Sequence, residues 1–302
     1  MSYRGPQTFH YHAYALAFGG YVTDKQHNVL PIHVAPSVLS YAGGYGSASE
    51  TNVNIGFPLK FPFGEEGTPD FHIYIGRAFT EVSGIDTGED DRAKPFKTMV
   101  RSILDDVRIN DVVAIGHSEA ILTSTHGKDE QEGHIVVGDS DVFGLRVAGK
   151  EVHLNKRSLA RLAPTFAGLQ GQLNTQPAPS ALSGKGSVSD SWFDNLFDWN
   201  DPDAVPDDHD LRYARDIAEQ NRRIHAEMER SARFSLFDAV DAPGLKTYKS
   251  SIFVENFGRI FLGEVIVSHG TKEVTMFRID LGCDNCGDVG GSGGSTNGGP
   301  PP

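Results

Sequence analysis

Glycine and proline break the first half of the chain so often that a long helix has no room to form there. Between residues 9 and about 163, short apolar or alternating runs such as Phe71–Val82 and Val107–Ile115 end at glycine, proline or polar residues. Alternation with a period of two is typical of strands that bury one face. The 34 glycines and 16 prolines of the chain supply the turns between such runs. We therefore expect antiparallel β structure.

Two segments have the pattern of β-hairpins. In the first, Val142–Val147 and Glu151–Leu154 flank Ala148-Gly149-Lys150, and in the second, Arg259–Ser268 and Glu273–Leu281 flank a turn at residues 269–272. A glycine-containing turn supplies the positive φ that a tight reversal needs.

The expected fold is mainly β, an antiparallel sandwich or barrel-like domain with one long helix and a C-terminal hairpin. Composition divides the chain into a β-rich domain (1–168), a linker with an aromatic segment (169–206), a helix (207–236), a C-terminal hairpin region that completes the sheet (237–284) and a flexible Gly/Pro tail (285–302).

The helix is expected from about Asp208 to Ala232, because carboxylates precede a thin, one-sided apolar stripe. The preceding linker contains an aromatic segment that a short helix would gather on one face. Such a segment either docks in an apolar groove of a partner or covers an edge of its own β domain. Its candidate interaction residues are Trp192, Phe193, Leu196, Phe197 and Trp199.

Charge and hydropathy exclude several classes of partner. The 27 Lys and Arg residues against 40 Asp and Glu residues give a net charge of −13, which disfavours binding to nucleic acid. No run of 18 apolar residues occurs, so membrane insertion by a helix is not expected. The N-terminus lacks the pattern of a secretory leader, which favours the cytoplasm and leaves export by a signal-less route open.

One string resembles the nucleophile elbow of serine hydrolases. A strand runs into Gly116-His117-Ser118, but Ala120 stands where an elbow needs glycine, and a strand-like run follows. The alternative interpretation is two strands joined at Gly116. If the site were catalytic, the base would be His117 or His153, and the acid Glu119 or Asp139.

Histidines and cysteines supply two further candidates. His10 and His12 project to one face of a strand, and a third histidine such as His33 from a neighbouring strand would complete a divalent metal site. A polar stripe on a half-exposed strand is the alternative, and no cofactor is predicted. Cys283 and Cys286 form half of a zinc knuckle, and we expect a local disulfide or two free thiols there.

The chain has an opening Ala13-Tyr14-Ala15-Leu16 strand and a closing hairpin from Gly144 to Val152. In these two elements it resembles the β-rich choice-of-anchor domains, type P, of bacterial surface proteins. The resemblance covers roughly half of the chain and implies a surface or structural module without enzymatic activity.

The leading hypothesis is a non-enzymatic structural or interaction protein. It would self-assemble into a homo-oligomer through the linker aromatics, the helix and the glycine-rich tail. The first alternative is a β-barrel metal-binding protein or metal-dependent enzyme that uses a histidine cluster. The second is a serine hydrolase at Ser118.

Overall fold

The computed structural model of the chain describes residues 9–23, 29–57, 71–87, 96–127, 130, 132–157, 163–169, 231–248, 250–255, 257–268, 271–281 and 287–299. Their strands are β1 (His10–Thr23), β2 (Val29–Val38), β3 (Gly44–Phe57), β4 (Phe71–Asp86), β5 (Phe96–Ile109), β6 (Val113–His126), β7 (His134–Val137), β8 (Asp141–Phe143), β9 (Arg146–Val147), β10 (Lys150–Glu151), β11 (His153–Lys156), β12 (Ser231–Ser235), β13 (Phe237–Asp241), β14 (Lys246–Tyr248), β15 (Ser251–Val254), β16 (Gly258–Ser268), β17 (Lys272–Leu281) and β18 (Gly287–Gly299).

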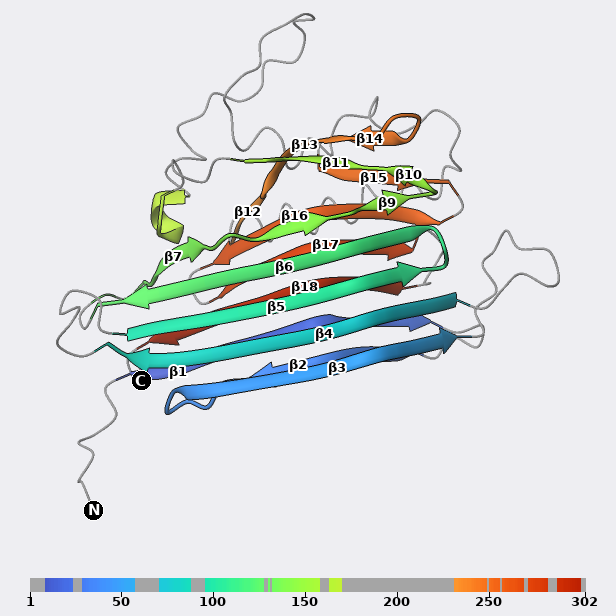
Figure 1. Cartoon of the computed structure of the whole chain (residues 1–302). Helices are drawn as coiled ribbons and strands as arrows, with labels where there is room; N and C mark the ends of the chain where they lie inside the picture. Colours follow the sequence, from blue (N-terminus) through green and yellow to red (C-terminus); the bar gives the residue numbers. More distant parts are fainter. Residues whose placement is uncertain are drawn as a thin grey trace, which may run out of the picture.

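Two antiparallel sheets face each other and enclose the core (Figure 1). Sheet A has the order β14-β15-β16-β17-β18-β1-β2, with β12 also beside β16. Sheet B has the order β10-β9-β6-β5-β4-β3, with β7 and β8 also beside β6. Strand β18 packs over β5 and β6, and β1 packs over β4 and β5. The sheets share no strand in the described part of the chain, so the sandwich, and not the barrel-like alternative, is the observed fold.

Both expected hairpins are present. Strands β9 and β10 pair across Ala148 and Gly149, whose φ angles of 49° and 75° define a tight turn with two left-handed residues. Strands β16 and β17 pair around residues 269–271, and they join β1 and β2 in sheet A through β18. The turn between β5 and β6 uses the same geometry, with φ values of 48° at Asn110 and 51° at Asp111.

The long helix is not supported. Most of it lies in residues 170–230, outside the described part of the chain, together with the linker. Its expected C-terminal end is instead strand β12, which pairs with β16, and the strand that follows, β13, pairs with β11. Phe234, Leu236 and Phe237 are buried in the core, so their burial outweighed a thin helical stripe. The described residues contain only a short helix at 166–169, and no described helix could cross a membrane.

The expected flexible tail is the largest correction. Residues 287–299 form β18, which lies between β1 and β17 and is hydrogen-bonded to both. A glycine-rich segment contributes little side-chain burial of its own, which is why its composition indicated disorder. Here the neighbouring strands supply the ladder, and large side chains occupy the space that the glycines leave open.

Glycines of β18 let the two sheets approach closely. A Cβ on Gly291 would lie 2.5 Å from Leu104 Cδ1 and 2.5 Å from Phe277 Cζ. A Cβ on Gly294 would lie 2.9 Å from Val100 Cγ2. On the adjacent strand, Ala13 and Ala15 are also small and fully buried. The interior is therefore narrow under β18 and β1.

A line of unusual backbone crosses both sheets at one level, and we call it the seam. Positive φ values occur at Ala35, Ser292 and Gly263 on alternate strands of sheet A, and at Asn52 and Asp106 on alternate strands of sheet B. Each pair of neighbouring strands keeps the same residue register on both sides of the seam, so no register shift occurs there.

The inward-facing side of each strand changes at the seam. In β4, Phe71, Ile73 and Ile75 are buried before it, and Ala78, Thr80 and Val82 are buried after it. Strand β6 changes in the same way between Ile115 and Ser118. Because all neighbouring strands shift phase together, both halves of the strands keep one face in the core.

Hydroxyl groups bridge the two sheets at the seam. Thr80 Oγ1 donates a hydrogen bond to the Ala35 carbonyl oxygen at 2.7 Å. Ser292 Oγ donates one to the Ser118 carbonyl oxygen at 3.1 Å. Ser102 Oγ donates to the Leu16 carbonyl oxygen at 3.3 Å. Each bond satisfies a backbone acceptor from the opposite sheet. The narrow interior is what makes these direct contacts between sheets possible.

Adding a side chain at an inward-facing glycine of β18 tests whether the two sheets are close together. We expect Gly291→Val to lower the free energy of unfolding by about 1–3 kcal/mol, because the new side chain overpacks the interior against Leu104 and Phe277. Gly293→Ala is the control, since its Cβ meets nothing closer than the Val274 carbonyl oxygen at 3.5 Å. Urea unfolding measures both, and equal stability of the two variants would contradict the narrow interior.

Candidate functional site

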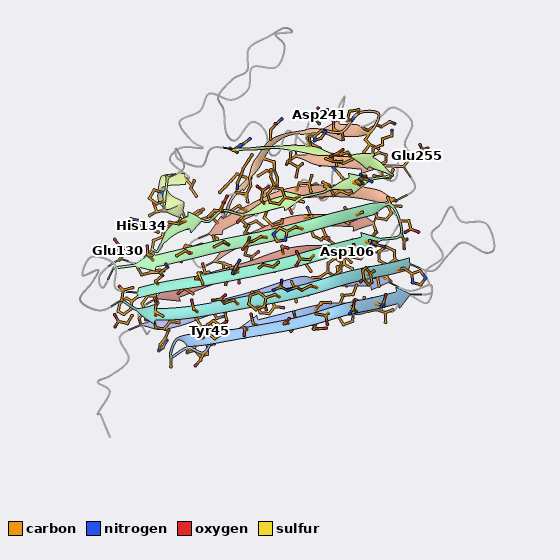
Figure 2. The ribbon with its side chains drawn as sticks, in the orientation of Figure 1. Tyr45, Asp106, Glu130, His134, Asp241 and Glu255 are labelled. Atoms are coloured by element: carbon orange, nitrogen blue, oxygen red, sulfur yellow. The ribbon has the colours of Figure 1, made fainter. Side chains whose placement is uncertain are left out.

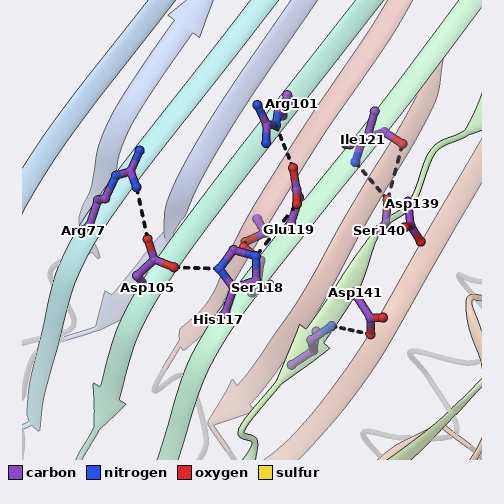
Figure 3. A network of polar contacts seen from close by, with 12 residues as sticks. Arg77, Arg101, Asp105, His117, Ser118, Glu119, Ile121, Asp139, Ser140 and Asp141 are labelled. Carbon is purple, nitrogen blue, oxygen red and sulfur yellow. Dashed lines mark hydrogen bonds and ion pairs between the residues drawn. The ribbon is translucent and has the colours of Figure 1, made fainter.

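A line of charged side chains crosses the outer face of sheet B (Figure 3). Arg77, Asp105 and His117 are directly opposite one another on β4, β5 and β6. Asp105 contacts Arg77 at 3.6 Å and His117 Nδ1 at 2.6 Å. Glu119 lies 3.8 Å from His117 Nε2 and 2.6 Å from Arg101 Nε. We call these five residues the sheet B network.

The local chemistry of the sheet B network is that of paired surface charges. His117 lies between two carboxylates, and an arginine binds the far side of each one (Figure 3). The His117 ring also lies 6.1 Å from the ring of Phe143, its partner on β8. Part-exposed ion pairs of this kind contribute little to stability. The five residues of the network include no serine, threonine or cysteine that could act as a nucleophile.

Ser118 lies on the other side of sheet B from this network. Its side chain is fully buried in the sandwich, and Oγ has no hydrogen-bond partner among the described residues. Neighbouring strand residues point to opposite faces, so His117 and Ser118 cannot form a dyad. Of the residues considered for a hydrolase, the structure brings together His117 and Glu119 and separates both from the serine.

The other two candidates for the hydrolase are also placed elsewhere. Asp139 is ion-paired with Lys156 at 2.5 Å, and this contact lowers the pKa of the Asp139 carboxyl. His153 is exposed on β11, opposite Asp241 of β13. Neither residue belongs to the sheet B network.

The three expected metal ligands do not form one cluster. His10 and His12 lie on one face of β1, where their rings are 6.2 Å and 6.4 Å from that of Tyr41. His33 on β2 is opposite Gly19, seven residues beyond His12 along β1, or about 23 Å at 3.3 Å per residue. No group of three His, Cys, Asp or Glu suited to a metal occurs among the described residues. Cys283, Cys286 and the Trp192–Trp199 segment lie outside the described part.

The interior at one end of the sandwich contains a second group of polar residues. His126 of β6 and Lys272 of β17 are both almost fully buried. His126 Nε2 lies 3.3 Å from Ser124 Oγ, whereas Nδ1 has no partner among the described residues. The Phe9 ring covers the imidazole at 5.1 Å. Glu130 and His134, labelled in Figure 2, are at the same end and contact each other at 3.6 Å.

Burial controls the protonation of this group. It lowers the pKa of His126 to about 4, and the nearby positive charge of Lys272 adds to the effect. Burial also lowers the pKa of Lys272, against the attraction of Glu132. Strand alternation could have identified Lys272, since Val274 and Met276 mark the inward phase of β17. The glycine at position 270 instead favours a turn at residues 269–272, which includes Lys272.

The buried imidazole should make stability depend on pH. The folded pKa of about 4 lies below the usual 6.5, so only the unfolded state binds the proton between these values. The contribution of His126 to the free energy of unfolding is therefore fully present above pH 6.5. It decreases by about 3 kcal/mol as the pH falls from 6.5 to 4. Urea unfolding should show a weaker pH dependence over this range in His126→Gln than in the exposed control His33→Gln. An unchanged pH dependence in His126→Gln would refute the assignment.

Comparison with known proteins gives a family but no activity. No curated protein and no solved structure matches the chain significantly. Residues 9–268 match a family described as a domain of unknown function (DUF8256). The match spans all the strands from β1 to β16 and includes the sheet B network. Because it covers most of the sequence, the chain belongs to the DUF8256 family.

Proposed function

We propose that the protein is a non-enzymatic structural or interaction protein that self-associates through its edge strand β3. The observation that carries the proposal is the open edge of this strand, which carries a single charged side chain. Strand β3 is 14 residues long and lies at the edge of sheet B. It contains no proline, lysine or arginine. A long edge strand without such protection is a template for another strand.

The other described edges are less suited to pairing. Strand β2, at the end of sheet A, contains Pro31 and Pro36, and Ala35 between them has a positive φ. At the opposite ends of the two sheets, β10 has two residues and β14 has three. Proline removes a donor from the ladder, and short strands offer few groups to pair. Strand β3 is thus the described edge with the greatest capacity for a partner.

The side chains of β3 fit a second copy of the same strand. Ser47, Ser49 and Thr51 are exposed and uncharged, and Tyr45 is 64% exposed near the start of the strand (Figure 2). The one charge, Glu50, accepts a hydrogen bond from the Ala35 backbone N–H at 2.6 Å. Two-fold pairing places the same strand on both sides of the interface. A strand with only one charge favours such pairing in a chain with a net charge of −13, because the other surfaces carry most of the like charge and repel one another.

The strand proposed for self-association differs from the contact elements that the sequence predicts. The glycine-rich C-terminal segment was expected to act as a free contact element. Its residues 287–299 pair with β1 and β17 inside sheet A, so they are not available for this role. The linker aromatics and the helix lie outside the described residues, and β3 takes their place in the proposal.

Charge substitution on β3 tests the self-association. We expect Ser49→Lys with Thr51→Lys to weaken association by at least about tenfold, because antiparallel overlap brings like charges in the middle of the two strands together. The control carries Val136→Lys and Thr247→Lys, the same added charge at exposed positions of β7 and β14. Light scattering after size exclusion, over a wide concentration range, measures the mass.

The wild type and the control should form dimers or larger assemblies, and the β3 variant should approach the 32.8 kDa monomer. A wild-type monomer at every concentration would reject the proposal. So would a β3 variant that associates as strongly as the control.

A further inference from the structure

A trough runs along β18 on the outer face of sheet A, on the opposite side of the sheet from the core. Its volume is about 270 Å³. Leu16 and Tyr21 of β1 form one wall, and Thr275 and Arg278 of β17 form the other. This surface belongs to sheet A, so an inference from it is independent of self-association through β3 of sheet B.

The strand register explains why the surface is hollow. Gly290 lies between Arg278 and Gly19, and Gly293 lies between Thr275 and Leu16. The outward positions of β18 therefore carry no side chains over this stretch, whereas the two flanking strands carry large ones. The same glycine strand that narrows the interior also leaves a groove outside.

The charged end of the trough is rigidly built. Arg278 donates two hydrogen bonds to Glu264, at 2.7 Å and 3.2 Å, and a third to Asp288 Oδ2 at 3.3 Å. Its guanidinium carbon lies 4.1 Å from the centre of the Phe261 ring. Paired contacts of this kind fix both the position and the plane of the guanidinium. Partial burial raises the pKa of the Asp288 carboxyl to about 6, while 36% of its side chain stays exposed to a ligand.

Several polar groups around the trough retain hydrogen-bonding capacity. Among the described residues, Asp288 uses only Oδ2, and the Tyr21 and Thr275 hydroxyls make no hydrogen bond. Each terminal nitrogen of Arg278 makes one of these hydrogen bonds and so keeps one N–H. The Tyr21 side chain is 45% exposed. Donors and acceptors are therefore mixed along both walls, beside one accessible aromatic ring.

We propose that this trough binds a neutral saccharide, with one sugar ring lying over the glycine floor against Tyr21. The C–H face of a pyranose packs on the electron-rich face of an aromatic ring. Sugar hydroxyls both donate and accept, which suits the mixed groups of Asp288, Arg278 and Thr275. The charges of Arg278 are already balanced by two carboxylates, so an ionic ligand gains little. A volume just below the usual range for small-molecule pockets fits a single ring unit.

Affinity electrophoresis of the full chain tests the proposal, in native gels that contain barley β-glucan, xylan, galactomannan or dextran. We expect at least one polysaccharide to retard the wild type. Tyr21→Ala removes the stacking surface, and Gly293→Val fills the floor at a position with room for a Cβ. Each should weaken that retardation at least tenfold in apparent Kd. Tyr21→Phe, which retains the ring, should keep most of the binding.

Phe143→Ala is the matched control, because it removes an exposed aromatic side chain from β8 of the other sheet, away from β3. It should bind as the wild type does, and urea unfolding confirms that each variant is folded. Tyr21 is exposed, so its removal leaves the core intact. The proposal fails if none of the four polysaccharides retards the wild type. It also fails if Tyr21→Ala binds as strongly as Phe143→Ala.

Discussion

The short distance between the two sheets is the constraint on which the rest of the structure depends. Hydroxyl groups of one sheet reach backbone carbonyls of the other at the seam, as Thr80 does at Ala35. Such contacts need an interior narrower than one filled by large side chains on both sides. Small inward residues provide it, above all Gly291 and Gly294. The hydroxyl bridges then satisfy backbone acceptors at or beside the seam.

The glycine-rich strand β18 links the narrow interior to the outer surface of sheet A. Facing inward, β18 lets Leu104 and Val100 of sheet B fill the core. Facing outward, its bare positions leave the trough beside Tyr21 and Arg278. Sheet B carries ion pairs on its outer face and an open edge at β3. The two proposed interaction surfaces therefore lie on different sheets, and each can be altered without changing the other.

The candidate catalytic residues show how strand geometry decides chemistry. His117 and Ser118 are adjacent in sequence, which suggested a nucleophile beside its base. A strand places adjacent residues on opposite faces, so one joins a surface network and the other faces the core. The metal hypothesis meets a similar limit, because His33 pairs far along β1 from His10 and His12. Sequence proximity and residue type could not supply either the face or the register.

The sequence by itself determined the β class, the sandwich as one of two architectures, and the turns at Ala148-Gly149 and after Ser268. These features follow from local alternation and turn chemistry, which act over a few residues. Only the tertiary structure decided that residues 287–299 form a central strand, because their stability comes from neighbouring strands and from side chains of the opposite sheet. The tertiary structure also decided that neighbouring strands change their inward-facing side together at the seam. A strand can make this change only when the strands beside it make the same one.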